Sequence, residues 1–543
     1  MGINDRHSLV LKISKDDPLL EKKKILMHIN GSESEVRIYF SSATCPEWTK
    51  ITLQAALRYA RVIHLNEAEL YFGRGDVPLD FYSTRNELES LNSILSVIDT
   101  LLSGATSKSK EDLQDLKGAT IDLISSLGDK NDEEIRIEKC SCSTVELLLQ
   151  WGKNNGVKTK LQIAYIEGAG RGAVAMEDLN IGDTALEIPE SIIICEELVY
   201  ETEMFHVLKE IDGISAETML LLWSMNERYN PDSKFKIYFE TLPESFNTGL
   251  SFGLDALAAL EGTLLFEEIM QAKEHLRTQY DELFPMLCCN HPDIFKPELY
   301  TWDKFLWACE LWYSNSMKVV FADGKLRTCL VPIAGFLNHS LCPHIMHYGK
   351  VDSVTNFLKF PLLLPCREGE QCYLSYGNFS SSHLITFYGF LPKGDNSCDV
   401  IPLDINTPEA NDSGDCLESD PMHMVRGTWL SSNHDIFYYG LPPQLLDHFR
   451  DDKLHKKTYD YLVKEVEILE LLQSVFNEMM DGLGEYDYTE SDNLNWDVKL
   501  ALEFKDLQRR IISSVLASCS SGLKMLETEL NQIYSKSDKD GLA

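Results

Sequence analysis

The stretch PIAGFLNHS, residues 332–340, places the polar pair Asn338 and His339 directly after an apolar run. A second stretch, LSYG at residues 374–377, and a third, FYGF at residues 387–390, each set a tyrosine beside a glycine. Taken singly, each pattern is weak evidence. The first fits a capping turn with a hydrogen-bonded histidine, and the tyrosines fit core aromatics whose hydroxyl groups have partners.

A glycine-rich stretch, EGAGRG at residues 167–172, follows a predicted strand at residues 161–166. Such glycines could belong to a dinucleotide-binding turn. A parallel crossover needs a dozen or more residues, whereas only residues 173–179 precede the turn-like stretch NIGD at residues 180–183. The pattern therefore favours two strands joined by a tight turn, with glycines that let backbone approach a ligand or simply form a loop.

The composition fits a large chain with several hydrophobic cores and an acidic surface. The chain has 543 residues, 44% of them hydrophobic, and two or three domains are expected. Its 50 basic and 85 acidic residues give a formal charge of −35, which repels phosphate backbones and argues against nucleic-acid binding. Lysine-rich protein segments suit such a surface, although acidic surfaces are common without a cationic partner.

No segment predicts a membrane span or a targeting signal. The apolar runs are shorter than the ~20 residues that a transmembrane helix needs, and the first residues lack a secretory or transit pattern. We expect no membrane association and a cytoplasmic or nuclear location, with plastid import open if the natural start lies elsewhere. The 14 cysteines form no regular framework, which predicts that most of them are free thiols and that the chain has no metal site.

Residues 1–140 form a region whose role the sequence does not reveal, and a domain boundary is expected near residues 129–134. We predict three strands at residues 9–13, 25–29 and 36–40, and a helix that presents Leu88, Leu91, Leu95 and Ile98 on one face.

The middle of the chain alternates between strand and helix patterns. Short strands are predicted in residues 157–189 and again in residues 319–332 and 356–376. Between them, residues 215–320 have a helical pattern, including a helical stretch at residues 254–274 that ends before Pro285. A helical block therefore interrupts the small-strand region.

The last part of the chain is predicted to be mainly helical, with exposed acidic loops at residues 404–421 and 481–492. Two apolar stripes at helical spacing predict packed helices. They consist of Leu462, Val466, Leu469, Leu472 and Phe476, and of Phe504, Leu507, Ile511 and Val515.

Together and in this order, the motifs resemble the SET-domain protein methyltransferases, specifically the subgroup that includes the Rubisco large-subunit methyltransferase and the actin-histidine methyltransferase. The resemblance rests on residues 167–172, on LNHS at residues 337–340 and on the two tyrosine segments. It extends to YFETLP at residues 238–243 and FLWA at residues 305–308, and covers about residues 151–534.

The resemblance implies an α+β fold: a SET-domain β core of short strands with a helical insertion, a C-terminal all-helical substrate-binding domain and an extra N-terminal α/β region. The implied domains are an N-terminal region at residues 1–140, a SET domain at residues 141–395 with an insertion at about 215–318, and a helical substrate-binding domain at residues 396–543. The core strands are expected to be mostly antiparallel. The segments of Asn338, His339 and Tyr376 should meet in a threaded, knot-like arrangement.

The function implied by the resemblance is S-adenosylmethionine-dependent methylation of a protein, with a lysine of a non-histone protein as the leading acceptor. Tyr376 occupies the position of the family's catalytic tyrosine, and the C-terminal helical domain would bind the protein substrate. The implied cofactor-binding residues are Glu167, Gly168, Ala169, Asn315, Asn338, His339, Tyr376 and Tyr388.

Three positions depart from the family pattern. Asn315 follows Ser314 where the family usually has an arginine that pairs with the cofactor carboxylate, Gly335 stands where an aspartate is common, and His383 stands where an acid often begins the final helix. Loss of the bidentate charge pair predicts weaker cofactor binding. A catalytically weakened SET scaffold that acts as a protein-binding module is therefore the alternative to an enzyme, and histidine is the alternative acceptor.

Overall fold

The computed structural model describes residues 7–29, 31, 34–40, 47–73, 81–105, 107–128, 136–140, 142–403, 422–431, 433–434, 438–450, 458–484 and 494–540. The predicted acidic loop at residues 404–421, most of the one at residues 481–492 and the whole boundary predicted near residues 129–134 lie outside these residues.

Two compact units make up the chain. The first contains Met1–Ile124, Asp255–Leu264 and Asp395–Ala543, and the second contains Ser125–Leu254 and Leu265–Gly394. The division into three domains stays a prediction. None of the helices in the described residues combines the length and the apolar character of a membrane span.

The N-terminal part of the first unit packs helices on a two-stranded antiparallel sheet. Strands β1 (His7–Lys12) and β2 (Glu35–Phe40) pair along their whole length and confirm two of the predicted strands. The helices are α1 (Leu20–Ile29), α2 (Trp48–Ile63), α3 (Glu67–Tyr71), α4 (Thr84–Ser103) and α5 (Ser107–Gly128). The apolar face predicted on α4 is buried, which confirms that helix.

The strand predicted at residues 25–29 is wrong, because this stretch belongs to α1. Lys23 and Leu26, three residues apart, are buried, whereas Ile25 and Ile29 are 59% and 44% exposed. This burial follows the helical period and not the alternation of a strand. The β-branched isoleucines favour a strand, but packing of the opposite face of this segment against the core stabilises a helix instead.

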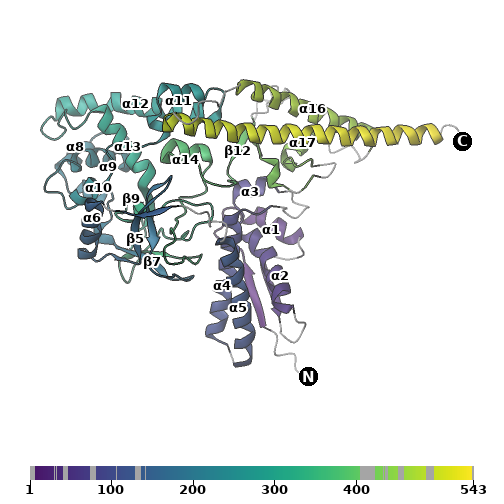
Figure 1. Ribbon diagram of the computed structural model, residues 1–543, viewed down its shortest axis with the longest axis horizontal. Coiled ribbons are helices and arrows are strands. Elements are labelled where there is room, and N and C mark those ends of the chain that lie inside the picture. The colour runs from purple at the N-terminus through teal and green to yellow at the C-terminus, as the bar shows by residue number, and fades with distance from the viewer. Residues whose placement is uncertain are drawn as a thin grey trace. The chain divides into compact units, whose positions relative to one another are not determined.

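The rest of the first unit is mainly helical. It contains α11 (Leu254–Ala259), α15 (Pro443–Phe449), α16 (Tyr459–Gly482), α17 (Trp496–Asp540), η6 (Thr428–Leu430) and a strand pair, β12 (Val400–Leu403) with β13 (His423–Arg426), that the sequence did not predict. Helices α16 and α17 lie side by side (Figure 1). Their predicted stripes meet in a core that includes Leu462, Leu469, Leu472, Phe476, Ile511 and Val515.

The second unit contains the short strands that were predicted for the SET core. One sheet has the order β3 (Ile137–Lys139), β5 (Leu161–Ile166), β6 (Gly170–Ala175); another has β10 (Val351–Asp352), β11 (Phe357–Pro361), β7 (Thr184–Pro189), β4 (Lys158–Thr159); and β8 (Ser316–Val320) pairs with β9 (Leu326–Leu330). All these pairs are antiparallel. β5 and β6 form a hairpin that pairs Ile166 with Gly170, which confirms the tight turn.

Helices separate β7 from β8 and confirm the helical insertion. The helices and 3-10 turns of this unit are α6 (Ser143–Asn154), η2 (Glu190–Ile192), α7 (Glu197–Tyr200), α8 (Glu203–Leu208), α9 (Ala216–Glu227), α10 (Lys236–Thr241), η3 (Gly249–Ser251), α12 (Leu264–Asn290), α13 (Trp302–Asn315), η4 (Ala334–Phe336) and α14 (Ser381–Tyr388). Of the β segment predicted at residues 356–376, only β11 is a strand, and the remainder pairs through isolated bridges.

The helical stretch predicted at residues 254–274 is wrong at both its middle and its end. It is divided between α11 and α12, and α12 continues through Pro285 to Asn290. Gly262 separates the two helices with a φ of +82°, a conformation that glycine adopts without penalty. Pro285 removes one helical hydrogen bond, but Phe284 and Leu287 beside it are buried and hold the helix in place.

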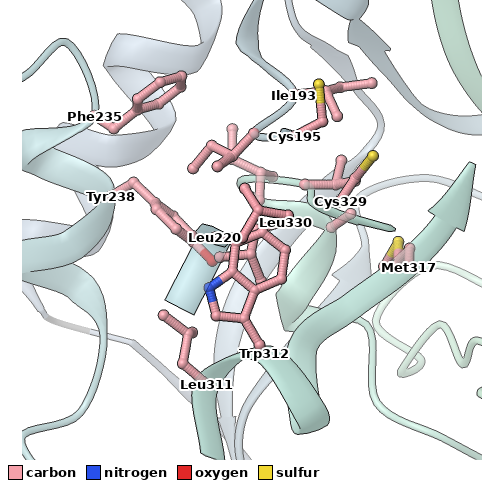
Figure 2. Close-up of a cluster of buried hydrophobic side chains, with 14 of the residues drawn as sticks. Ile193, Cys195, Leu220, Phe235, Tyr238, Leu311, Trp312, Met317, Cys329 and Leu330 are labelled. Atoms are coloured by element: carbon pink, nitrogen blue, oxygen red, sulfur yellow. The ribbon is translucent and has the colours of Figure 1, made fainter. Parts of the chain in front are cut away.

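A buried cluster joins the insertion helices to the β8–β9 hairpin. Figure 2 shows Leu220 of α9 and Trp312 of α13 near Leu330 of β9. The indole Nε1 of Trp312 donates a hydrogen bond of 2.8 Å to Ser224 Oγ in α9. This packing fixes the C-terminal end of α13, where Asn315 lies.

Candidate active site

The segments of Asn338 and Tyr376 meet in the second unit. The Leu374 amide donates to the Asn338 carbonyl oxygen over 2.8 Å, and His339 forms a short parallel bridge with Leu374. The Tyr376 hydroxyl donates to the Leu337 carbonyl oxygen over 3.0 Å. The predicted meeting of the two segments is confirmed, whereas threading of the chain stays a prediction.

A strained turn leads into this segment. Ile333, directly before η4, has a φ of +73°, which costs a residue with a β-branched side chain roughly 1–2 kcal/mol. Its side chain is buried, and its Cδ1 occupies the space that a Cβ at Gly152 would need. Packing against α6 thus holds the turn in a conformation that the chain would otherwise avoid, as is common at functional sites.

Aromatic rings stack behind the two segments. The Tyr376 ring lies 5.2 Å from the His339 ring and 5.0 Å from the Tyr388 ring, with interplanar angles of 30° and 28°. Tyr388 ends α14, and Gly389 follows it with a φ of +78°. A Cβ at Gly389 would overlap the Asn247 carbonyl oxygen, so only glycine allows this close end of the helix.

The titratable groups of the stack and the nearby Tyr348 are neutral near pH 7. Desolvation lowers the pKa of His339 to about 4. Desolvation raises the pKa of Tyr348 to about 12 and raises that of Tyr376 above its ordinary range. A site of neutral donors and acceptors suits a reaction that depends on positioning more than on a strong acid or base.

A cavity of about 30 Å³ lies beside the stack, which is room for a slender group comparable in size to one or two water molecules. Its lining residues are Ser314, Asn315, Ser316, Met317, Ala334, Gly335, Leu337, Tyr348, Leu374, Tyr376 and Tyr388. The cavity therefore brings together the end of α13, the η4 turn and the predicted catalytic tyrosine.

Arg171 and Gly172, in the β5–β6 hairpin, contact Asn338. The Asn338 side-chain amide donates to the Arg171 carbonyl oxygen over 3.3 Å, and a Cβ at Gly172 would lie 3.0 Å from Asn338 Nδ2. Both residues belong to the glycine-rich stretch at residues 167–172 on which the family resemblance rests, but their contact with Asn338 was not predicted from the sequence. The predicted cofactor-binding residues 167–169 form an exposed turn at the hairpin tip, and their role stays a prediction.

Two of the departures from the family pattern face each other. The Asn315 side-chain amide donates to Ser314 Oγ over 2.8 Å. A Cβ at Gly335 would lie 3.2 Å from Asn315 Oδ1. A neutral amide thus lies opposite a residue without a side chain, so neither position carries a charge that would be destabilising if it were buried without a partner.

Comparisons with known proteins agree with this architecture. No protein-family profile matches the chain. The chain is 26% identical over 349 residues to the chloroplastic Rubisco large-subunit N-methyltransferase of Pisum sativum, covering 62% of this chain and 68% of that protein. It is 26% identical over 285 residues to the chloroplastic fructose-bisphosphate aldolase-lysine N-methyltransferase of Arabidopsis thaliana, covering 50% and 58%. The actin-histidine N-methyltransferase of Gallus gallus matches at 23% identity over 45% of its length.

A solved structure completes the comparison. The SET domain of LSMT bound to lysine and AdoHcy superposes with a TM-score of 0.54 at 19% identity, covering 72% of this chain and 94% of that chain. The chain therefore has the fold of a SET domain and is similar in sequence to the Rubisco large-subunit methyltransferase-like subgroup. The comparison supports the predicted α+β fold with its small sheets and helical insertion.

The SET core has polar groups that fit S-adenosylmethionine. Among the described residues, Gln371 Nε2 is buried without a hydrogen-bond partner, and a Cβ at Gly172 would lie 2.8 Å from it and 3.0 Å from Asn338 Nδ2. Buried donors normally have partners. The carboxylate, ribose and adenine of S-adenosylmethionine offer acceptors for such amides, so the residues present fit this cofactor.

One group of side chains with metal-ligand chemistry occurs among the described residues: His344, Cys366 and Cys372. The Tyr373 amide donates to His344 Nδ1 over 3.0 Å, which places the proton of the neutral ring on Nε2. Hydrogen bonds from Cys372 and then from His344 lower the pKa of Cys366 to about 6. A metal on Nε2 would require Nδ1 to be protonated, so the cluster fits a thiolate hydrogen-bond network better than a metal site.

Proposed function

We propose that this protein is an S-adenosylmethionine-dependent protein N-methyltransferase that methylates a lysine of a non-histone protein. The observation that carries this proposal is the contact of the Asn338–His339 segment with Tyr376 beside a narrow cavity. The named activities of the plant relatives, which act on Rubisco and on fructose-bisphosphate aldolase, support it.

Each group has a defined part in this proposal. S-adenosylmethionine, when bound, supplies an activated methyl group. Asn338 and His339 hold the cofactor, with Glu167, Gly168, Ala169 and Asn315 along its other sides. These residues would orient the methyl group toward the acceptor nitrogen. The transfer, in which a C–N bond forms as the C–S bond breaks and S-adenosylhomocysteine leaves, depends mainly on alignment of the reacting atoms.

The catalytic residue is Tyr376. Its proton is used in the hydrogen bond to the Leu337 carbonyl oxygen, which leaves the phenolic oxygen as an acceptor for an N–H of the incoming amine. Such a contact fixes the direction of the nitrogen lone pair as charge develops on the nitrogen. Tyr388, stacked on Tyr376, holds the ring in this orientation.

A lysine acceptor must lose a proton before it attacks. From a reference pKa near 10.4, deprotonation at pH ~7.4 costs about 4 kcal/mol. Burial of the amine in the cavity between Tyr348 and Tyr376 disfavours its charged form and reduces this cost. The neutral state of both tyrosines removes a negative charge that would otherwise stabilise the ammonium.

Histidine is the second candidate acceptor, favoured by the similarity to an actin-histidine N-methyltransferase. A neutral imidazole needs no costly deprotonation near pH 7. Rubisco, fructose-bisphosphate aldolase and actin, the proteins named for the relatives, form a first panel of acceptors. Amino-acid analysis of a labelled protein separates methyllysine from methylhistidine and decides between the two acceptors.

The protein substrate binds through the C-terminal helices α16 and α17. Large apolar side chains on these helices are exposed, among them Leu471, Trp496, Met525 and Tyr534, and we take them as the candidate contacts for the protein substrate. The reaction takes place in the cytoplasm, the nucleus or a plastid, the last supported by the chloroplastic names of the plant relatives.

Calorimetric titration with S-adenosylmethionine tests the proposal. Wild type should bind it, and the double variant Asn338→Ala/His339→Ala should not. His275→Ala, a change at an exposed histidine of α12, is the control and should bind as wild type does. Absence of binding by folded wild type at millimolar cofactor would overturn the enzyme function and favour the weakened scaffold, in which Asn315 and Gly335 have removed the cofactor site.

A further inference from the structure

Arg171 is a half-buried cation of β6 that, among the described residues, forms no ion pair. Its Nη1 donates to the Thr241 carbonyl oxygen over 2.7 Å, and its guanidinium lies over the Phe336 ring at 5.3 Å. By contrast, Arg327 in the same unit contacts the carboxylates of Asp323 and Glu197. A guanidinium has five N–H donors, so one carbonyl leaves most of them available to a ligand.

The surroundings of Arg171 are those of the proposed cofactor site. Its carbonyl oxygen accepts the Asn338 side-chain amide. The Arg171 guanidinium lies over Phe336, and Phe336 directly follows Gly335 in the chain. Gly335 and Asn315 face each other and both line the narrow cavity. The charge of Arg171 therefore lies next to the segment that also carries the proposed cofactor contacts.

A partly buried guanidinium is stabilised by an anion that accepts hydrogen bonds from its coplanar N–H donors, and a carboxylate accepts two parallel ones. S-adenosylmethionine carries one carboxylate. Asn315 is neutral and cannot supply the opposite charge from the end of α13. We propose that Arg171 binds the carboxylate of the cofactor and provides from β6 the cation that α13 lacks. This inference rests on the proposed function and names a binding residue for it.

The stacking on Phe336 supports this role. The face of an aromatic ring holds a guanidinium in place without using its N–H donors, so these donors stay oriented and available to the cofactor carboxylate. Gly335 has no side chain and leaves the neighbouring space open. The geometry thus offers an explanation for how the chain keeps cofactor affinity despite the neutral residue at Asn315.

Binding of two ligands that differ only in the carboxylate tests the inference. S-adenosylmethionine and its decarboxylated analogue are titrated into wild type, Arg171→Met and Arg171→Lys. Wild type should bind S-adenosylmethionine about tenfold to a hundredfold more tightly than the analogue. Arg171→Met should bind the two with affinities within about twofold of each other, and Arg171→Lys should show an intermediate ratio.

Arg228→Met is the matched control. Arg228 is also half-buried and lies over an aromatic ring, that of Trp307 at 3.8 Å. It should keep the wild-type ratio of affinities, and thermal unfolding should show that every variant is folded. A wild-type ratio in Arg171→Met would overturn the inference alone. Absence of cofactor binding by wild type would overturn the proposed function, and this inference with it.

Discussion

Replacement of Gly172 by alanine tests whether Gly172, Gln371 and Asn338 lie at the cofactor, and its effect can be worked out from the structure. The added Cβ would lie 2.7 Å from Ile166 Cγ1, 2.8 Å from Gln371 Nε2 and 3.0 Å from Asn338 Nδ2. All three distances are shorter than ordinary carbon contacts. Two of the three neighbours are the ends of amide side chains, which can move away more easily than the strand backbone.

Overpacking of this kind costs about 1–3 kcal/mol of folding stability, which lowers the melting temperature by roughly 2–4 °C per kcal/mol in a unit of 150–250 residues. The larger effect should be on ligand binding. Displacement of Asn338 and Gln371 would remove one or two of the hydrogen bonds proposed for the cofactor, each worth about 0.5–1.5 kcal/mol. We expect the dissociation constant for S-adenosylmethionine to rise about tenfold.

Calorimetry and thermal unfolding of Gly172→Ala measure both effects. Gly118→Ala is the control, because Gly118 lies in α5 and a Cβ there meets nothing within 4 Å. That variant should be as stable as wild type or up to about 1 kcal/mol more stable, with unchanged affinity. A folded Gly172→Ala protein with wild-type affinity would refute the placement of Gly172, Gln371 and Asn338 at the cofactor.

Two further predictions concern stability. Glu465 is buried and accepts hydrogen bonds from Arg450 Nε over 2.6 Å and from the Tyr439 hydroxyl over 2.9 Å. Glu465→Gln should therefore lower the free energy of unfolding, measured in urea, by roughly 3–5 kcal/mol. The control Glu467→Gln, at an exposed position, should change it by less than about 1 kcal/mol. Desolvation on folding lowers the pKa of His339 from 6.5 to about 4, so the unfolded state binds this proton more tightly than the folded state does. The contribution of the neutral ring to the free energy of unfolding is therefore complete above pH 6.5 and is lost as the pH falls toward 4. Melting temperatures between these pH values should therefore fall less steeply for His339→Gln, and equal slopes would contradict this assignment.

The spacing of apolar residues predicted helices correctly where one face of the helix is buried along most of its length. The stripe from Leu462 to Phe476 is the buried face of α16, and the stripe from Leu88 to Ile98 is that of α4. It failed at Ile25, where β-branched side chains lie on the exposed face of a helix whose buried face is short. Propensity is a weak guide in such a case, because tertiary packing decides.

The candidate site was only partly predictable, because its contacts join residues far apart in the chain. The family resemblance singled out Asn338 and Tyr376, which the structure brings together. Nothing in the local pattern indicates that Arg171 lies over Phe336 or that Ile333 has a positive φ. These features follow from long-range packing, such as that of Ile333 against α6, and no short stretch of sequence encodes them.

Transfer of labelled methyl groups from S-adenosylmethionine to the acceptor panel of Rubisco, aldolase and actin tests the central claim most directly. Wild type should label at least one of these proteins, with the label recovered as methyllysine. Tyr376→Phe should bind the cofactor as wild type does and transfer the label at least about a hundredfold more slowly. Equal rates for wild type and Tyr376→Phe would contradict the account, as would a cofactor-binding wild type that labels neither this panel nor a whole-cell protein extract.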